Sequence, residues 1–98
     1  MIPNAYFAPK KTTSQTDLEN FVKLNYEKYN KVRFIFDLKN ESVDINTMKK
    51  FSETFDKFRS HTLQKLVETC IIITDPLSAS VFKKGLNMVR VDKPVKII

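Results

Sequence analysis

Four apolar residues at helical spacing form the clearest periodic pattern in the chain. They recur at intervals of three, four and three residues, which places them on one face of a helix: Met48, Phe51, Phe55 and Phe58. Asp44 or Ser42 precedes this helix and can cap its N-terminus. Glu53 and Lys57 are spaced to form an i,i+4 ion pair on its outer side. The segment 61–68 either prolongs the helix or forms a loop.

An earlier helix is predicted from Thr16 to about Asn30. Thr16 and Glu19 have the spacing of a capping box, in which a hydroxyl and a carboxylate bond to each other's backbone amides. The apolar residues that follow share one face: Leu18, Phe21, Val22 and Tyr29. The polar, proline-containing segment 1–15 is expected to be an N-terminal arm, in which only residues 5–8 could form a short strand.

Strands are predicted where β-branched and aromatic residues gather. Residues 32–38 alternate between two faces, one of which is entirely apolar. Residues 70–74 are almost continuously apolar, which is typical of a short strand buried on both faces. Residues 95–98 follow Pro94 and form a last short strand.

A third helix is predicted after the strand at 70–74. Asp75 is placed at its N-cap and Pro76 at its first position, where the missing amide hydrogen costs nothing. Lys83 and Lys84 in the last turn suit the negative end of the helix dipole. Gly85 then takes the position after the helix, where we expect a left-handed backbone with positive φ.

These elements alternate as in an α/β protein. We predict a single domain over residues 16–98, with about four mostly parallel strands and three helices. If consecutive strands lie side by side, right-handed crossovers place all three helices on one face of the sheet. The core should contain Phe21, Phe34, Phe36, Phe51, Phe55, Phe58, Ile72 and Val81.

The opposite face of such a sheet would be apolar. It would carry Ile35, one or both of Ile71 and Ile73, and Ile97 or Ile98. We take Ile35, Ile73 and Ile98 as candidate partner-binding residues, because an apolar patch larger than roughly a few hundred Å² marks an interaction surface.

Two sources of cover for that face are open. Tyr6 and Phe7 in the N-terminal arm can fold back onto it, or a second chain can cover it. In the second case the protein is part of a homo-oligomer or of another assembly, and its arm reaches a neighbour. Tyr6 and Phe7 are therefore also candidate partner-binding residues.

The net charge of the chain is +6, from 17 basic and 11 acidic residues. Most of the basic residues are lysines, and Arg33, Arg59 and Arg90 are far apart in the sequence. Proteins that read nucleic acid usually add arginine forks for phosphate and guanine. Nucleic-acid binding is therefore an alternative function that the composition does not favour.

Residue counts exclude several chemistries. A single glycine cannot build a glycine-rich phosphate loop, and a single histidine with a single cysteine cannot build a structural zinc site. Cys70 begins a buried strand, where burial raises the pKa of a thiol and opposes a nucleophilic role. We expect no cofactor and no enzymatic activity.

A magnesium-dependent enzyme is the second alternative function. Asp37 ends one strand and Asp75 follows the next, so parallel pairing would bring both carboxylates to one edge of the sheet. Glu41 and Asp44 lie nearby in the sequence. However, Asp44 and Asp75 already have roles as helix caps, so we do not expect a bound metal.

Three segments, FIFDLKNESVDINTMKKF, CIIITDPLSASVFKKGL and KPVKII, show a strand ending in Asp-Leu, a striped helix, a second strand, a short helix and a last strand. Over residues 16–98 this order resembles the STAS domains of sulfate transporters and anti-sigma-factor antagonists. The resemblance implies a reduced STAS-like fold and a non-enzymatic protein-interaction or assembly module.

Some STAS domains are switched by phosphorylation of a serine just before the main helix. The corresponding turn here reads Asp44-Ile45-Asn46-Thr47, so Ile45 or Asn46 occupies the position of that serine. The resemblance therefore makes Asn46 and Thr47 candidate partner-binding residues, without the serine switch.

The location of the protein is expected to be cytoplasmic. No apolar run approaches the roughly 18 residues of a membrane span, and the first residues lack the pattern of a secretory signal. A single cysteine fits a reducing compartment. Abundant Lys, Asn, Ile and Phe indicate an AT-rich genome, such as that of a large DNA virus, in which case the protein would be virion-associated.

Overall fold

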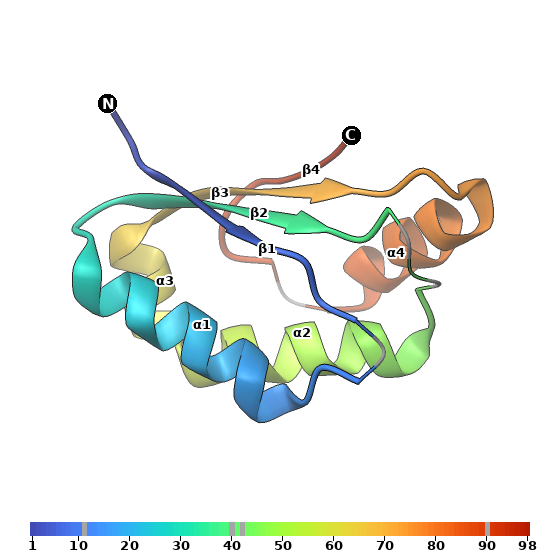
Figure 1. The fold of residues 1–98 in the computed structure, drawn as a ribbon, viewed down its shortest axis with the longest axis horizontal. Helices are drawn as coiled ribbons and strands as arrows, with labels where there is room; N and C mark the ends of the chain where they lie inside the picture. The colour runs from blue at the N-terminus through green and yellow to red at the C-terminus, as the bar shows by residue number, and fades with distance from the viewer. Residues whose placement is uncertain (11, 40, 42, 90) are drawn as a thin grey trace.

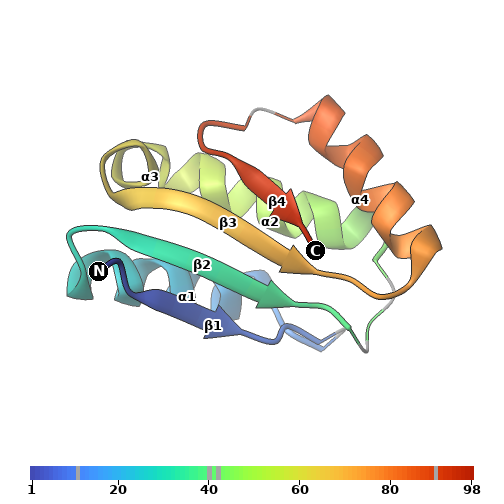
Figure 2. The ribbon, with the colours of Figure 1, turned by 90° about the horizontal axis from the view of Figure 1, so that it is seen from above.

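The described part of the chain contains four parallel strands, each hydrogen-bonded to the next in the order β1-β2-β3-β4 (Figure 2). This computed structural model describes residues 1–10, 12–39, 41, 43–89 and 91–98. The strands are β1 (Asn4–Phe7), β2 (Val32–Asp37), β3 (Leu66–Ile72) and β4 (Val95–Ile97). The predicted α/β class and parallel sheet are therefore confirmed.

The helices all lie on one side of this sheet (Figure 1). They are α1 (Gln15–Lys28), α2 (Ile45–Lys57), α3 (Arg59–Lys65) and α4 (Pro76–Met88). Because consecutive strands are also neighbours in space, crossovers of one hand return the chain to the same side each time. Within the described residues, the other face of the sheet carries no helix or strand (Figures 1 and 2).

Strand β2 forms the centre of the core because its apolar side chains alternate toward the helices. Val32, Phe34, Phe36 and Leu38 are each at most 2% exposed. The ring centroids of Phe34 and Phe36 are 5.8 Å apart, and the ring of Phe36 lies 4.9 Å from that of Phe51 on α2. The alternation of β2 and the apolar stripe of α2 therefore meet as the sequence predicts.

Most of the predicted core is confirmed. Phe34, Phe36 and Phe51 are buried. Four further predicted residues are partly buried and pack against them: Phe21, Phe55, Phe58 and Val81. The prediction for Ile72 is wrong, since it is half-exposed and lies between two buried neighbours, Ile71 and Ile73, which point to the helices. Ile72 therefore faces the other side of the sheet.

Helices α1 and α2 begin with the hydrogen bonds typical of an N-cap. The N-cap of α1 is Ser14, two residues before the predicted cap Thr16: the amide of Asp17 donates to Ser14 Oγ at 3.1 Å, and the amide of Ser14 donates to Asp17 Oδ2 at 3.2 Å. Two overlapping capping boxes exist in the sequence, and the earlier one is used. Asp44 caps α2 as predicted, whereas the alternative cap Ser42 lies outside the described residues.

A break at Phe58 accounts for the fourth helix of the described chain. Phe58 has φ −107° and ψ 24°, and it is both the C-cap of α2 and the N-cap of α3. The ambiguous segment 61–68 is therefore helical to Lys65 and extended from Leu66. Three helices were predicted because the sequence carries no proline or glycine at the break.

The ion pair predicted between Glu53 and Lys57 is wrong. Glu53 Oε1 lies 3.9 Å from Lys49 Nζ, one turn earlier on α2. Lys57 Nζ lies 3.3 Å from Glu19 Oε2, because α1 packs against α2 and presents that carboxylate. Tertiary contact thus redirects a charge that local spacing alone would pair within one helix.

Strand β3 begins four residues earlier than predicted. The pairing of β2 with β3 shifts between Val32, which pairs with Leu66, and Phe34, which pairs with Thr69. Leu66 and Thr69 are both buried although they are three residues apart. A strand with such an irregularity has no period of two in its sequence, which is why residues 66–69 were not recognised as a strand.

Residues 1–15, expected to form an arm, contribute strand β1 to the sheet. Asn4–Phe7 pairs in parallel with β2, and Ala5 pairs with Phe34 and is 7% exposed. The last residue of this segment, Gln15, is the first residue of α1. The first residues are therefore integrated in the domain by backbone hydrogen bonds.

Helix α4 confirms two expectations and contradicts a third. Asp75 caps it, with the amide of Ser78 donating to Asp75 Oδ2 at 3.2 Å, and Pro76 is its first residue. Gly85 lacks the predicted positive φ and lies inside the helix, which continues to Met88. A Cβ at Gly85 would lie 2.6 Å from Cε and 2.9 Å from Cγ of Met48. Close packing of α4 on Met48, and not a left-handed backbone, therefore explains the glycine.

Replacing Gly85 by alanine should destabilise the protein by about 1–2 kcal/mol, because Met48 is buried and its side chain must move. In a Met48→Ala background the same change should stabilise by up to about 1 kcal/mol, since alanine is the better helix former. Urea denaturation of the four proteins measures both effects.

The control is Ser80→Ala, at an exposed position of α4. It should change the free energy of unfolding by the same amount in the wild type and in the Met48→Ala variant. An equal effect of Gly85→Ala with and without Met48 would contradict the packing explanation.

Candidate functional site

The bare face of the sheet is built from alternate side chains of the four described strands. The pairing aligns Asn4 with Arg33; Tyr6 with Ile35, Cys70 and Lys96; and Asp37 with Ile72. Glu68 and Ile98 extend these rows, because alternate residues of a strand share a face. This surface, called here the bare face, consists of Asn4, Tyr6, Arg33, Ile35, Asp37, Glu68, Cys70, Ile72, Lys96 and Ile98.

One end of the bare face is a polar cluster around Arg33. Its Nε donates to Glu68 Oε1 at 2.9 Å, and its Nη1 donates to Asn4 Oδ1 at 3.1 Å. The thiol of Cys70 donates to the same Glu68 oxygen at 3.5 Å. Burial, followed by the neighbouring Glu68, raises the pKa of the Cys70 thiol. The thiol is thus held protonated, as predicted, and is unsuited to nucleophilic attack.

At the other end, Asp37 links β2 to β1. The hydroxyl of Tyr6 donates to Asp37 Oδ2, and the amide of Lys39 donates to Asp37 Oδ1 at 3.0 Å. The hydrogen bond from Tyr6 is the main cause that lowers the pKa of Asp37, and the same bond raises the pKa of Tyr6. Tyr6 therefore has a defined orientation on the surface although it is 58% exposed.

Three apolar side chains lie among these polar groups. Ile35 is half-buried on β2 in the row of Tyr6 and Cys70, whereas the half-buried Ile72 on β3 is in the row of Asp37. Ile98 is 65% exposed just beyond β4. The described charged groups of the bare face are two positive, Arg33 and Lys96, and two negative, Asp37 and Glu68. A face that mixes apolar side chains with balanced charges fits a protein interface better than a surface of one charge sign.

Three of the five residues predicted for this face or for its cover are part of it. Tyr6, Ile35 and Ile98 lie on it. Phe7 and Ile73 do not: the ring of Phe7 stacks on that of Phe21 at 4.8 Å, and Ile73 is 7% exposed in the core. Consecutive strand residues point to opposite sides, so Tyr6 and Phe7 cannot share a face. The other members of the bare face were not candidates: Asn4, Arg33, Asp37, Glu68, Cys70, Ile72 and Lys96.

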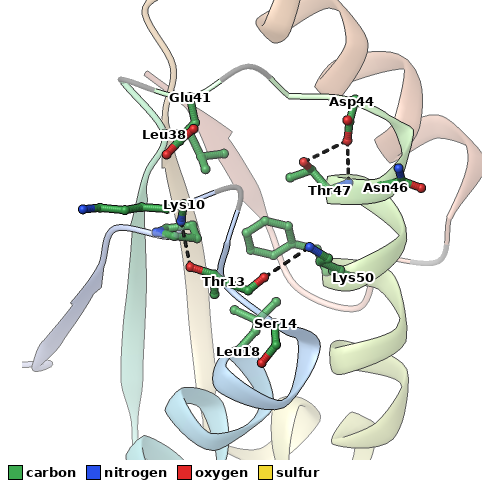
Figure 3. A pocket seen from close by; sticks show the side chains of 12 residues that line it. Lys10, Thr13, Ser14, Leu18, Leu38, Glu41, Asp44, Asn46, Thr47 and Lys50 are labelled. Carbon is green, nitrogen blue, oxygen red and sulfur yellow. Dashed lines mark hydrogen bonds between the residues drawn. The ribbon is translucent and has the colours of Figure 1, made fainter.

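Asn46 and Thr47 lie at a different place, beside a hollow of about 220 Å³ at the carboxyl ends of β1 and β2 (Figure 3). Asp44 Oδ1 accepts from the amide of Thr47 at 2.9 Å and from its hydroxyl at 3.1 Å. Across the hollow, Lys50 Nζ donates to the carbonyl oxygen of Thr13 at 3.2 Å. The amide and the hydroxyl of Thr47 are therefore both engaged by the cap of α2.

The carboxylates proposed for magnesium are engaged elsewhere. Asp75 accepts from both the amide and the hydroxyl of Ser78, the latter at 2.8 Å, and these bonds lower the pKa of Asp75. Asp37 accepts from Tyr6 and Lys39. Among the described residues, no three His, Cys, Asp or Glu side chains are grouped so as to hold a metal ion. The geometry gives the magnesium alternative no support.

Comparison of the chain with protein-family models, with curated proteins and with solved structures finds no match. The resemblance to STAS domains therefore stays a prediction. Within the described ranges, no helix has the length and apolar character needed to span a membrane.

A second apolar surface was not predicted from the sequence. It lies between α2 and α4, where Ile45 is 77% exposed and Met88 is 84% exposed. The sequence pattern places Ile45 in the turn before α2, and it places Met88 beyond the expected end of the helix at Gly85. The exposed apolar pair could have been found only by recognising that the helix continues through Gly85.

Proposed function

We propose that this chain is a non-enzymatic protein-interaction or assembly module that binds a protein partner across the bare face of its sheet. One observation carries the proposal: every described helix lies on the same side of an all-parallel sheet. Parallel sheets occur almost only with both faces covered. A partner would supply the second layer.

The charge distribution supports a protein partner for this face. The chain has a net charge of +6, yet the described charges of the bare face balance. The excess lysines therefore lie elsewhere, and a nucleic acid would gain no counterion release from this surface. A protein partner that offers both apolar side chains and charges of both signs, a second copy included, matches it better.

The proposal includes the STAS-like type and a cytoplasmic location. It is supported by the order of strands and helices over residues 16–98, which follows the expected order apart from the break at Phe58. The single cysteine, Cys70, is a buried free thiol, in keeping with a reducing compartment. In this proposal Asn46 and Thr47, which lie apart from the bare face, form a separate contact at the start of α2.

The test is a pair of charge insertions with matched controls. The double variant Ile72→Lys/Ile98→Lys should lose partner binding at least tenfold, because lysine ammonium groups would have to be desolvated in the interface. Leu24→Lys/Leu63→Lys adds the same charge at residues that are 64% and 47% exposed on α1 and α3, and it should bind normally. Self-association is measured by sedimentation, and other partners by capture from the native source.

Salt distinguishes the alternative function. Binding across the bare face should change little between 50 and 500 mM salt, whereas binding of a labelled DNA duplex would weaken linearly on a log–log scale. The proposal would be contradicted if the two double variants bound the partner equally well. It would also be contradicted if binding fell steeply with salt and were lost after nuclease treatment.

A further inference from the structure

The groove between α2 and α4 has a volume of about 480 Å³. Met48 and Gly85 line it where the two helices meet, with Val81 and Val89 beside them. Its remaining lining residues are Ile45, Lys49, Ser52, Lys84 and Met88. This surface is called here the α2/α4 groove, and the two helices that form it lie on the side of the sheet opposite the bare face (Figure 1).

Two apolar side chains that line this groove are largely exposed. Ile45 is 77% exposed and Met88 is 84% exposed. Leu77, two turns before Gly85 on α4 and outside the lining, is also 77% exposed. Clustered exposed apolar residues rimmed by polar groups mark an interaction site.

The charges along the groove have one sign. Lys49 and Lys84 are its charged lining residues within the described chain, and no described carboxylate lines it. Glu53, which pairs with Lys49 at 3.9 Å, lies on the adjoining exposed surface of α2 and outside the lining. The groove therefore combines an apolar lining with a positive rim, which is complementary to an apolar stripe flanked by carboxylates.

We propose that the α2/α4 groove binds an acidic amphipathic helix of a protein partner. A groove between two helices accepts a third helix along its length, with anchors at i, i+3, i+4 and i+7. Met48 and Met88 give its walls the flexible thioether side chains that adapt to such anchors. The lysines at the rim then pair with glutamates or aspartates that flank the apolar stripe.

Two other occupants fit the groove less well. A second copy of this chain would bring another net charge of +6 toward the two lysines. An anionic membrane is flat, and it would contact the rim residues Ile45 and Met88 without filling the space between the helices. Both occupants are outcomes of the test below.

This inference is independent of the function proposed for the bare face. The two surfaces lie on opposite sides of the sheet, so variants of one should leave binding at the other unchanged. A negative binding result for one surface would therefore not contradict the proposal for the other.

The experiment measures fluorescence anisotropy of a labelled peptide of about 16 residues with leucines at i, i+3, i+4 and i+7 and glutamates on the other faces. The wild-type protein should bind it, and Ile45→Glu or Met88→Glu should weaken binding at least tenfold. The matched control Leu24→Glu, at a residue 64% exposed on α1, should bind as the wild type does. Circular dichroism of each variant confirms folding.

Three further measurements can overturn the inference. A scrambled peptide of equal charge, in which the leucines share no face, should bind at least tenfold more weakly; equal binding would show mere attraction to the basic chain. Absence of binding to the amphipathic peptide would reject the site. The wild-type protein is also tested for dimerisation and for binding to phosphatidylserine vesicles. If either occurs and Met88→Glu abolishes it, the occupant of the groove is a second copy or a membrane and not a partner helix.

Discussion

Replacing Phe36 by alanine should lower the free energy of unfolding by about 4 kcal/mol, the largest effect expected of a single substitution here. Phe36 is fully buried, and its ring centroid lies within 6.5 Å of five other described rings. They are those of Phe7, Phe21, Phe34, Phe51 and Phe55. Strand β1, helix α1 and helix α2 thus all lose contacts when this one ring is removed.

Urea denaturation checks this expectation, with Phe36→Leu as a variant that keeps most of the buried volume and should cost only about 1–1.5 kcal/mol. Phe58→Ala is the matched control, since Phe58 is half-buried at the break between α2 and α3 and should cost clearly less. Equal losses for Phe36→Ala and Phe58→Ala would show that the core is not centred on β2.

Raising the pH from 9 to 12 should destabilise the protein through Tyr26. Tyr26 is 2% exposed, its hydroxyl lies 2.7 Å from Thr62 Oγ1, and burial raises its pKa to about 12. The folded state therefore holds this proton more tightly than the unfolded state, whose tyrosine titrates near its ordinary value of about 10. Stability is fully present below pH 10 and is lost as the pH rises toward 12.

The loss should reach about 1.4 kcal/mol at pH 11 and roughly 2.7 kcal/mol once the pH exceeds 12, from about 1.36 kcal/mol per pH unit. Tyr26→Phe lacks this titration, so the stability difference between wild type and variant should shrink over that range. Both proteins should carry Tyr6→Phe, because the hydrogen bond to Asp37 also raises the pKa of Tyr6. A stability difference that stays constant to pH 12 would contradict this role of Tyr26.

The two functional proposals rest on different kinds of observation. The bare face follows from the topology, because four parallel strands in sequential order place each described helix on one side. The α2/α4 groove follows from side chains, since Ile45 and Met88 are exposed beside Lys49 and Lys84, the charged lining residues of the described chain. Together they describe a small domain with one surface suited to a layered contact and another suited to a helix.

Local sequence patterns predict much of the fold. Strand β2 depends on strict alternation. The apolar stripe of α2 and the caps Asp44 and Asp75 depend on residues within one or two helical turns. All of these features lie where the sequence predicts them. Such features form hydrogen bonds and apolar faces within short segments, so their sequence is sufficient to reveal them.

Local sequence patterns predict less of the candidate site. The existence of a bare sheet face, with Tyr6, Ile35 and Ile98 on it, follows from alternation and sequential strand order. The choice of Ile73 failed because Ile72 and Ile73 are adjacent in an apolar run, where no polar residue marks the side that faces outward. Only the pairing of Ile72 with Asp37 on β2 fixes that choice.

The remaining differences arise where distant segments meet. The shifted register between β2 and β3 sets the start of β3, the bulk of Met48 makes a glycine necessary at position 85, and the packing of α1 on α2 redirects Lys57 to Glu19. Each depends on a contact between residues far apart in the chain. Local spacing determines the elements and their apolar faces, but register, close approach and exposed grooves follow from the shapes that meet when these elements pack.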